Sequence, residues 1–200
     1  MMKNKALASF IVGIMLMASG FAQPVLKTKW IVLNNASVRV NGSTNVNKFS
    51  CLVNGYFSLD TITCYKNGNV TALHGKLAIP VTSFDCMNAM MTSELRKTLK
   101  AKEFATLNIN FISLNKYPAL KPEQESINGI VTIELAGVTR KFEVNYKISM
   151  DAGRVIHMTG VQSIHFSDFK LTPPRKLGGM IKADDKLEVM FQINFSMAED

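Results

Sequence analysis

The sequence predicts an all-β protein, an antiparallel barrel of about eight strands with one amphipathic helix. Three observations support this prediction. Apolar and polar residues alternate with period two along most of the chain, short turn sequences separate the alternating segments, and one stretch, 87–100, has helical spacing instead. Strands that are apolar on one face and polar on the other are typical of antiparallel sheets with one wet side.

The alternation is clearest in 141–148, where Phe142, Val144 and Tyr146 share one face and charged or amide side chains take the other. Asn67-Gly68 and Ala136-Gly137 lie between alternating segments, as expected for tight β-hairpin turns. The predicted strands are 30–41, 49–58, 61–66, 70–83, 105–115, 126–136, 139–150, 153–166 and 185–197.

The stretch 87–100 is predicted to be a helix. Its apolar face consists of Met87, Met91, Leu95 and Leu99, which recur every four residues, with Met90 beside them. Asp85 and Asn88 are both candidates for its N-cap. The outer face is predicted to hold Thr92, Glu94, Arg96, Lys97 and Lys100. A closed barrel with this helix is favoured because it leaves no exposed strand edge. A two-sheet sandwich is the alternative, since the same alternation of apolar and polar residues fits both folds.

The N-terminus has the layout of a secretory signal peptide. Lys3 and Lys5 precede an apolar run over 7–17, and small residues occupy positions 20 and 22. We therefore expect cleavage after Ala22, export to the periplasm or the medium, and a single mature domain over 23–200. A transmembrane anchor is the alternative, but the apolar run is shorter than the ~20 residues that span a bilayer.

Composition narrows the class of partner. The chain has a formal net charge of +8, and removing Lys3 and Lys5 leaves 8 − 2 = +6. This modest excess favours transient contact with anionic surfaces such as phospholipid headgroups. The sequence contains no recognition-helix motif and no basic stretch interleaved with aromatics, so no nucleic-acid partner is predicted.

No catalytic or cofactor motif stands out in the sequence. The three histidines have no partner at metal-ligand spacing, and neither a nucleophile elbow nor a phosphate-binding loop is present. We therefore expect no metal, no cofactor and no catalysis. An enzyme remains a third hypothesis, which a pocket with convergent polar groups would support.

Three cysteines remain in the mature chain, and in an oxidising compartment two of them are expected to pair. We predict a Cys51–Cys86 disulfide with Cys64 free. Cys51 starts one strand and Cys86 follows another just before the helix. A Cys51–Cys64 bridge between neighbouring strands is the main alternative, and three buried thiols are the other.

Four segments, taken together in this order and spacing, resemble the YceI-like family of exported bacterial proteins. They are 37–45 (SVRVNGSTN), 77–85 with 95–104 (LAIPVTSFD, LRKTLKAKEF), 129–140 (GIVTIELAGVTR) and 167–171 (SDFKL). The resemblance spans about Trp30 to Phe195. It implies a lipocalin-like barrel whose lumen holds a long isoprenoid or another amphiphile, in a periplasmic or secreted setting.

The chain departs from the family pattern at three places. Asn45-Val46-Asn47 and Ser93-Glu94-Leu95 stand where many members carry histidine, and Lys170 replaces the glycine of Asp-Phe-Gly. The polar head of a ligand is therefore expected to be held differently, or the ligand to differ.

The candidate lumen residues share one property, since each lies on the apolar face of an alternating strand. They are Phe111, Ile133, Phe142, Val144, Tyr146, Phe191 and Ile193. The candidates for binding an anionic head are basic residues at the helix end and in the loop after Pro173-Pro174. They are Lys97, Lys100, Lys102, Arg175 and Lys176. The competing hypothesis is an envelope stress or structural protein whose barrel is filled by its own side chains.

Overall fold

The barrel is closed by eight antiparallel strands in the computed structural model, which describes residues 26–54, 58 and 60–198. Going around the barrel, each strand pairs with the next and the last pairs with the first. In that order the strands are β1 (Leu26–Val32), β4 (Thr61–Asn67), β5 (Val70–Pro80), β6 (Thr106–Leu114), β7 (Glu125–Leu135), β8 (Val138–Met150), β9 (Val155–His165) and β12 (Lys186–Ala198). The predicted fold class is confirmed, and the predicted signal peptide lies outside the described residues.

One edge of β12 has two partners. Its C-terminal residues pair with β1, while Glu188–Gln192 pair with β2 (Ser37–Ser43), which forms a hairpin with β3 (Lys48–Asn54). The single strand predicted over 30–41 is therefore wrong. A turn at Asn34 and Asn35 divides it, so that β1 and β2 follow each other along the same edge of β12.

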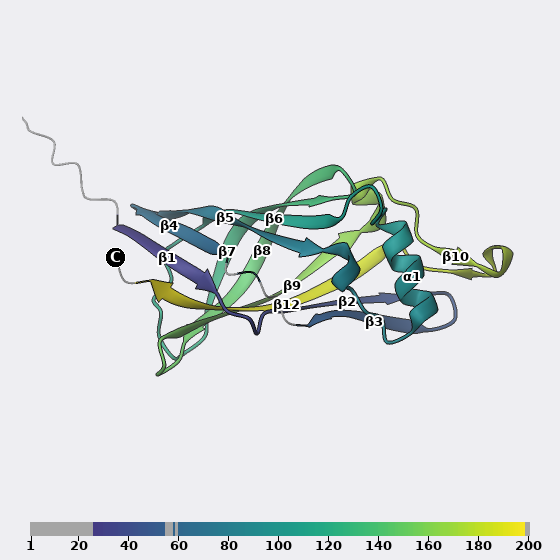
Figure 1. Cartoon of the computed structure of the whole chain (residues 1–200). Helices are drawn as coiled ribbons and strands as arrows, with labels where there is room; N and C mark the ends of the chain where they lie inside the picture. Colours follow the sequence, from purple (N-terminus) through teal and green to yellow (C-terminus); the bar gives the residue numbers. More distant parts are fainter. Residues whose placement is uncertain (1–25, 55–57, 59, 199–200) are drawn as a thin grey trace, which may run out of the picture.

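The hairpin β2–β3 extends the wall at the end where the helix lies, beyond the reach of β1 and β4 (Figure 1). β3 is linked to the segment after β5 by two backbone hydrogen bonds between Leu52 and Asp85, of 2.7 and 2.9 Å. A small hairpin of β10 (Arg175–Lys176) and β11 (Ile181–Lys182) projects from the same end (Figure 1).

The end of the barrel bounded by β1 and β4 is packed with side chains, and we call it the packed half. Trp30 and Phe195 are fully buried there, with ring centroids 5.6 Å apart. The other fully buried large side chains of this half are Ile62, Leu114, Ile127, Ile148, Ile156 and Met158. The opposite end, walled by β2, β3 and the distal parts of the long strands, is the hollow half described below.

The helix α1 (Ala89–Thr98) lies across the end of the hollow half. Asn88 is its N-cap, and its side-chain oxygen accepts a hydrogen bond from the Met91 amide at 3.0 Å. Leu95 and Leu99 are buried, as predicted, whereas Met87 and Met90 of the predicted apolar face are exposed. The predicted boundaries of 87–100 were too wide, because Met87 precedes the N-cap with a left-handed backbone (φ 57°).

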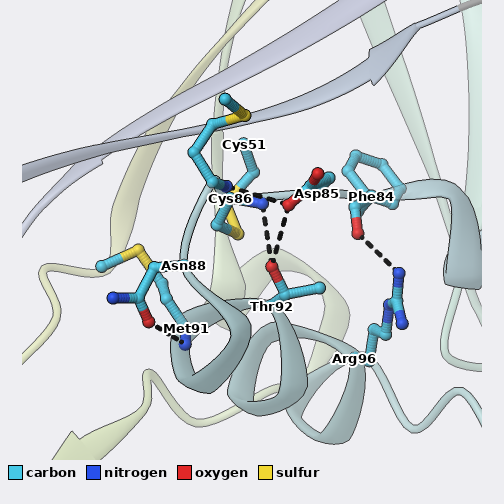
Figure 2. The surroundings of a disulfide bond; sticks show 9 residues. Cys51, Phe84, Asp85, Cys86, Asn88, Met91, Thr92 and Arg96 are labelled. Atoms are coloured by element: carbon cyan, nitrogen blue, oxygen red, sulfur yellow. Dashed lines mark hydrogen bonds between the residues drawn. A yellow bond between two sulfur atoms is a disulfide. The ribbon is translucent and has the colours of Figure 1, made fainter.

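Two side chains predicted on the outer face of the helix instead hold it in place (Figure 2). Thr92 is buried, and its hydroxyl accepts a hydrogen bond from the Cys86 amide at 2.9 Å and lies 3.3 Å from the Asp85 carboxylate. Arg96 donates to the backbone carbonyl of Phe84 at 3.0 Å. These polar contacts, together with the apolar face, fix the helix to the segment that precedes it.

The predicted disulfide is confirmed. Cys51 of β3 is bonded to Cys86, and Cys64 is free and buried in β4 (Figure 2 shows the bonded pair). The bond joins the β2–β3 hairpin to the residues just before α1, at the place where Leu52 and Asp85 also pair.

Burial of Cys64 gives a direct test of this arrangement. Burial raises the pKa of its thiol to about 12, which leaves almost no thiolate at neutral pH. We expect no thiol of the folded protein to react with a disulfide reagent at pH 8, and one thiol per chain to react in denaturant. Reaction of one thiol in the folded state would contradict the burial of Cys64, and three in denaturant would contradict the disulfide.

Candidate ligand-binding lumen

The hollow half contains a cavity of about 80 Å³. Its wall is made almost wholly of aliphatic and aromatic side chains, contributed by β2, β3, β5, β6, β7, β8, β9 and β12 and by the residue before β2. The lining residues are Ala36, Ser37, Val38, Val53, Leu77, Ile79, Ile109, Phe111, Val131, Ile133, Val144, Tyr146, Gln162, Ile164, Val189, Phe191 and Ile193.

Most of the predicted lumen residues meet at this cavity. Phe111, Ile133, Val144, Tyr146, Phe191 and Ile193 line it. Phe142 does not line it; its ring packs instead against Phe169, with centroids 6.1 Å apart. Phe169 belongs to η2 (Phe166–Phe169), a 3-10 turn after β9, which fills the part of the barrel that Phe142 faces.

Several lining residues outside the predicted set show the same alternation of apolar and polar residues as the predicted ones. Leu77, Ile79, Ile109 and Val189 lie on apolar faces of alternating strands, and periodicity alone does not show how far along the barrel each one lies. Val38 and Val53 belong to the β2–β3 hairpin, whose place in the wall follows from the divided edge of β12.

Both ends of the cavity are covered. The packed half forms its floor. At the other end Leu95 and Leu99 of α1 are buried, together with Phe166, Leu187 and the disulfide. Two or three inward-facing residues of each long strand reach the cavity, which corresponds to ~10 Å of barrel length at ~3.3 Å per residue. The wall offers few polar groups along this length.

Tyr146 places a phenol ring in the wall of this apolar space. The residue is almost fully buried, and its ring meets Phe191 edge-on with centroids 5.7 Å apart. Burial raises the pKa of the phenol well above its ordinary value, so the group is a neutral hydroxyl at any physiological pH. The site therefore offers desolvation and three neutral polar side chains, those of Tyr146, Ser37 and Gln162, with no charge among its lining residues.

The predicted head-binding residues are divided between two surface hollows at the α1 end. Lys97, Lys100 and Lys102 border an open hollow beside α1, together with Asp85 and Glu103. Lys176 lines a separate groove, and Arg175 is exposed beside it on β10. The structure therefore does not bring the five cations together into one site.

The groove that Lys176 lines has a volume of about 350 Å³ and lies between α1, the β2–β3 hairpin and the β10–β11 hairpin. Its apolar walls include Val46, Phe49, Met90 and Ile181. We call it the end groove, because it lies outside the covered end of the lumen.

The part of the chain that the structure describes contains no cluster of three histidine, cysteine or carboxylate side chains placed to hold a metal ion. Within the same residues, no helix has the length and apolar character needed to cross a bilayer.

His157 lies outside the lumen, in a polar cluster on the barrel wall. Its Nε2 is 2.9 Å from Asp151 Oδ2 and its Nδ1 is 2.7 Å from Asn194 Oδ1. Because both ring nitrogens face oxygen acceptors, the doubly protonated ring satisfies both contacts. The Asp151 carboxylate, and then the Asn194 amide oxygen, raise the pKa of His157. The pKa of Asp151 is lowered first by the hydrogen bond from the Val155 amide and then by His157.

This cluster predicts a pH dependence of stability. A raised folded-state pKa means that the contribution of His157 is fully present below its ordinary pKa of 6.5 and is lost as pH rises through the folded value. We expect NMR titration to give His157 a pKa above 6.5, and the Asp151→Asn variant to move it back towards that value. An unchanged pKa in the variant would show that this pair does not control the titration.

The model of the YceI-like domain matches residues 31–195. The chain belongs to the YceI-like family. The match covers all eight barrel strands at least in part, the β2–β3 hairpin and α1.

Solved structures share the fold of this YceI-like chain at low sequence identity. BcnA of Burkholderia cenocepacia is similar with a TM-score of 0.60 and 16% identity, covering 80% of this chain and 95% of BcnA. A polyisoprenoid binding domain from Saccharophagus degradans, implicated in plant cell wall breakdown, is similar with a TM-score of 0.62 and 9% identity, covering 85% of this chain and 98% of that domain. No curated protein matches the chain by sequence.

Proposed function

We propose that this protein is an exported carrier that holds the apolar tail of an amphiphile, an isoprenoid or a lipid, in the hollow half of its barrel. The observation that carries the proposal is the apolar cavity, which lies beside a packed half of the same barrel. Belonging to the YceI-like family supports it, as does the fold shared with the polyisoprenoid binding domain from S. degradans.

The energetics favour an occupied lumen. An empty cavity of this size costs ~2 kcal/mol at ~24 cal/mol per Å³, a cost that the packed half avoids. Burying ~300 Å² of tail surface contributes ~7 kcal/mol before ordering costs. After those costs, micromolar affinity is within reach.

The unliganded cavity is smaller than the ~150 Å³ that accommodates a benzene ring in an engineered apolar cavity. A long tail therefore requires the lumen to widen. Five apolar lining side chains are only partly buried, and these are the ones best placed to turn aside. They are Val38, Ile109, Ile133, Val189 and Phe191.

Export rests on the sequence of the first 22 residues and on the disulfide, which suits an oxidising compartment. The lining residues offer no nucleophile paired with a base, and we propose binding without catalysis. A polar head would remain at the α1 end, where Lys176 lines the end groove and Arg175 is exposed beside it.

The experiment is native mass spectrometry of the protein purified from the envelope of its own host without detergent, followed by organic extraction. We expect an adduct whose mass falls to that of the polypeptide after extraction, with the released compound carrying a long apolar chain. A polypeptide that never carries or takes up such a compound would support the competing hypothesis of a structural or stress protein with a filled core.

A further inference from the structure

The α1 end of the barrel exposes an unusual amount of apolar surface. Four of the large apolar side chains exposed in the described part of the chain lie on three short segments there. They are Val46 (63% exposed) in the β2–β3 turn, Met87 (81%) and Met90 (66%) at the start of α1, and Met180 (73%) in the β10–β11 hairpin.

These segments are held side by side. Val46 and Met90 both line the end groove. The Asn45 side chain donates to the Met180 carbonyl at 2.8 Å and accepts from the Lys182 amide at 2.9 Å, which clamps the β2–β3 turn to the β10–β11 hairpin. Val46 and Met90 are therefore positioned in advance at the end groove, Met180 lies on the clamped hairpin, and Met87 lies at the neighbouring hollow beside α1.

Met87 is an unexpected residue for its place. Its backbone is left-handed, with φ 57°, a conformation that favours glycine or asparagine and disfavours longer side chains. The side chain is nonetheless the most exposed of the large apolar ones described. Neither backbone preference nor packing explains a methionine here, whereas contact with an apolar partner does.

Basic residues predominate on the three segments that carry these apolar side chains. Segments 44–48, 87–90 and 174–182 contain Lys48, Arg175, Lys176 and Lys182 and no carboxylate. Four carboxylates lie nearby. Asp85 accepts a hydrogen bond from the Met87 amide at 2.9 Å, and the Ser43 hydroxyl binds Asp184. Glu94 lines the end groove, and Glu188 shares a hollow with Lys48. The turns at the other end mix both signs, with Lys116, Lys121 and Arg154 beside Glu123, Glu125 and Asp151.

We propose that the α1 end docks on the surface of an anionic phospholipid bilayer. Dispersed apolar tips ringed by cations suit a bilayer, because the tips enter the headgroup boundary while the cations meet lipid phosphates. The docking surface consists of Val46, Met87, Met90 and Met180 with Lys48, Arg175, Lys176 and Lys182. The proposal goes beyond carriage, because docking needs no ligand in the lumen.

Sedimentation with vesicles tests the proposal. We expect the mature protein to bind vesicles of equal parts phosphatidylglycerol and phosphatidylcholine, to bind pure phosphatidylcholine vesicles weakly, and to lose binding as salt rises from 50 to 500 mM. The Lys48→Ala, Lys182→Ala variant should partition about 25-fold less, at about fivefold per cation.

The Met87→Asn, Met90→Gln variant separates docking from folding. Asparagine suits the left-handed backbone and glutamine suits a helix, so thermal stability should stay equal or rise. Vesicle binding should fall by about tenfold or more. The matched control is Ile112→Thr, Val161→Thr, which removes exposed apolar surface from the barrel wall and should leave vesicle binding unchanged.

Three outcomes would overturn the proposal. They are an absence of binding to phosphatidylglycerol vesicles, binding that the two docking variants leave intact, and self-association through these residues without vesicle binding. A lumen variant such as Val144→Trp should still dock. Failure of docking and failure of carriage are therefore distinguished by separate measurements.

Discussion

The Val144→Trp variant is expected to lose retention of a long-chain amphiphile, by 100-fold or more, while remaining folded. Val144 is buried, faces the cavity from β8, and pairs across the sheet with Gly129 of β7. The indole fills space that a tail would occupy, and overpacking of this kind costs ~1–3 kcal/mol of folding stability. Retention is measured by uptake of a fluorescent fatty acid and by native mass spectrometry.

The matched control places the same ring on the other face of the same strand. Lys147 is exposed on the outer face of β8, so Lys147→Trp should leave uptake unchanged. If Val144→Trp takes up the amphiphile as well as the unaltered protein does, the tail does not lie in this cavity and the carrier hypothesis is wrong as stated.

Removing the disulfide should have the largest effect on stability. Cys51 and Cys86 are 35 residues apart. In the chain-entropy model, loss of a cross-link over this separation lowers the free energy of unfolding by ~4 kcal/mol. For a domain of this size, that corresponds to a fall in Tm of roughly 8–16 °C. The test is urea unfolding of the Cys51→Ala, Cys86→Ala variant. Ligand retention should also weaken, because the bond ties β3 to the segment that positions α1 over the lumen.

The Cys64→Ala variant is the control for loss of a buried sulfur. Cys64 lies in β4 and has no disulfide partner, so its loss should cost only the ~1 kcal/mol typical of a small core truncation. Equal effects in the two variants would show that the disulfide adds nothing beyond ordinary packing.

The barrel could be predicted because alternation in 139–150 and 185–197 reports directly which face of a strand is apolar. Depth along the barrel could not be predicted, since Phe142 and Val144 share a face and only Val144 reaches the cavity. The two differ because Phe142 packs against Phe169, a residue of the turn that follows a different strand, β9. A contact between residues so far apart in the chain leaves no local pattern in the sequence.

The missed break between β1 and β2 had a local signal, the Asn34-Asn35 pair, which is a common turn sequence. The roles of Thr92 and Arg96 had no such local signal in the sequence. On a helix that crosses the end of a barrel, polar side chains at the boundary of the apolar face meet backbone groups of the preceding segment. A two-faced helix pattern assigns such residues to solvent.

The position of Trp30 has a consequence for spectroscopy. It is the protein's one tryptophan, fully buried against Phe195 in the packed half and absent from the cavity wall. Its emission therefore follows the integrity of the packed half and responds little to whether the lumen is occupied. Fluorescence melting curves of this protein measure unfolding, and an added ligand becomes visible in them only through the Tm that it raises.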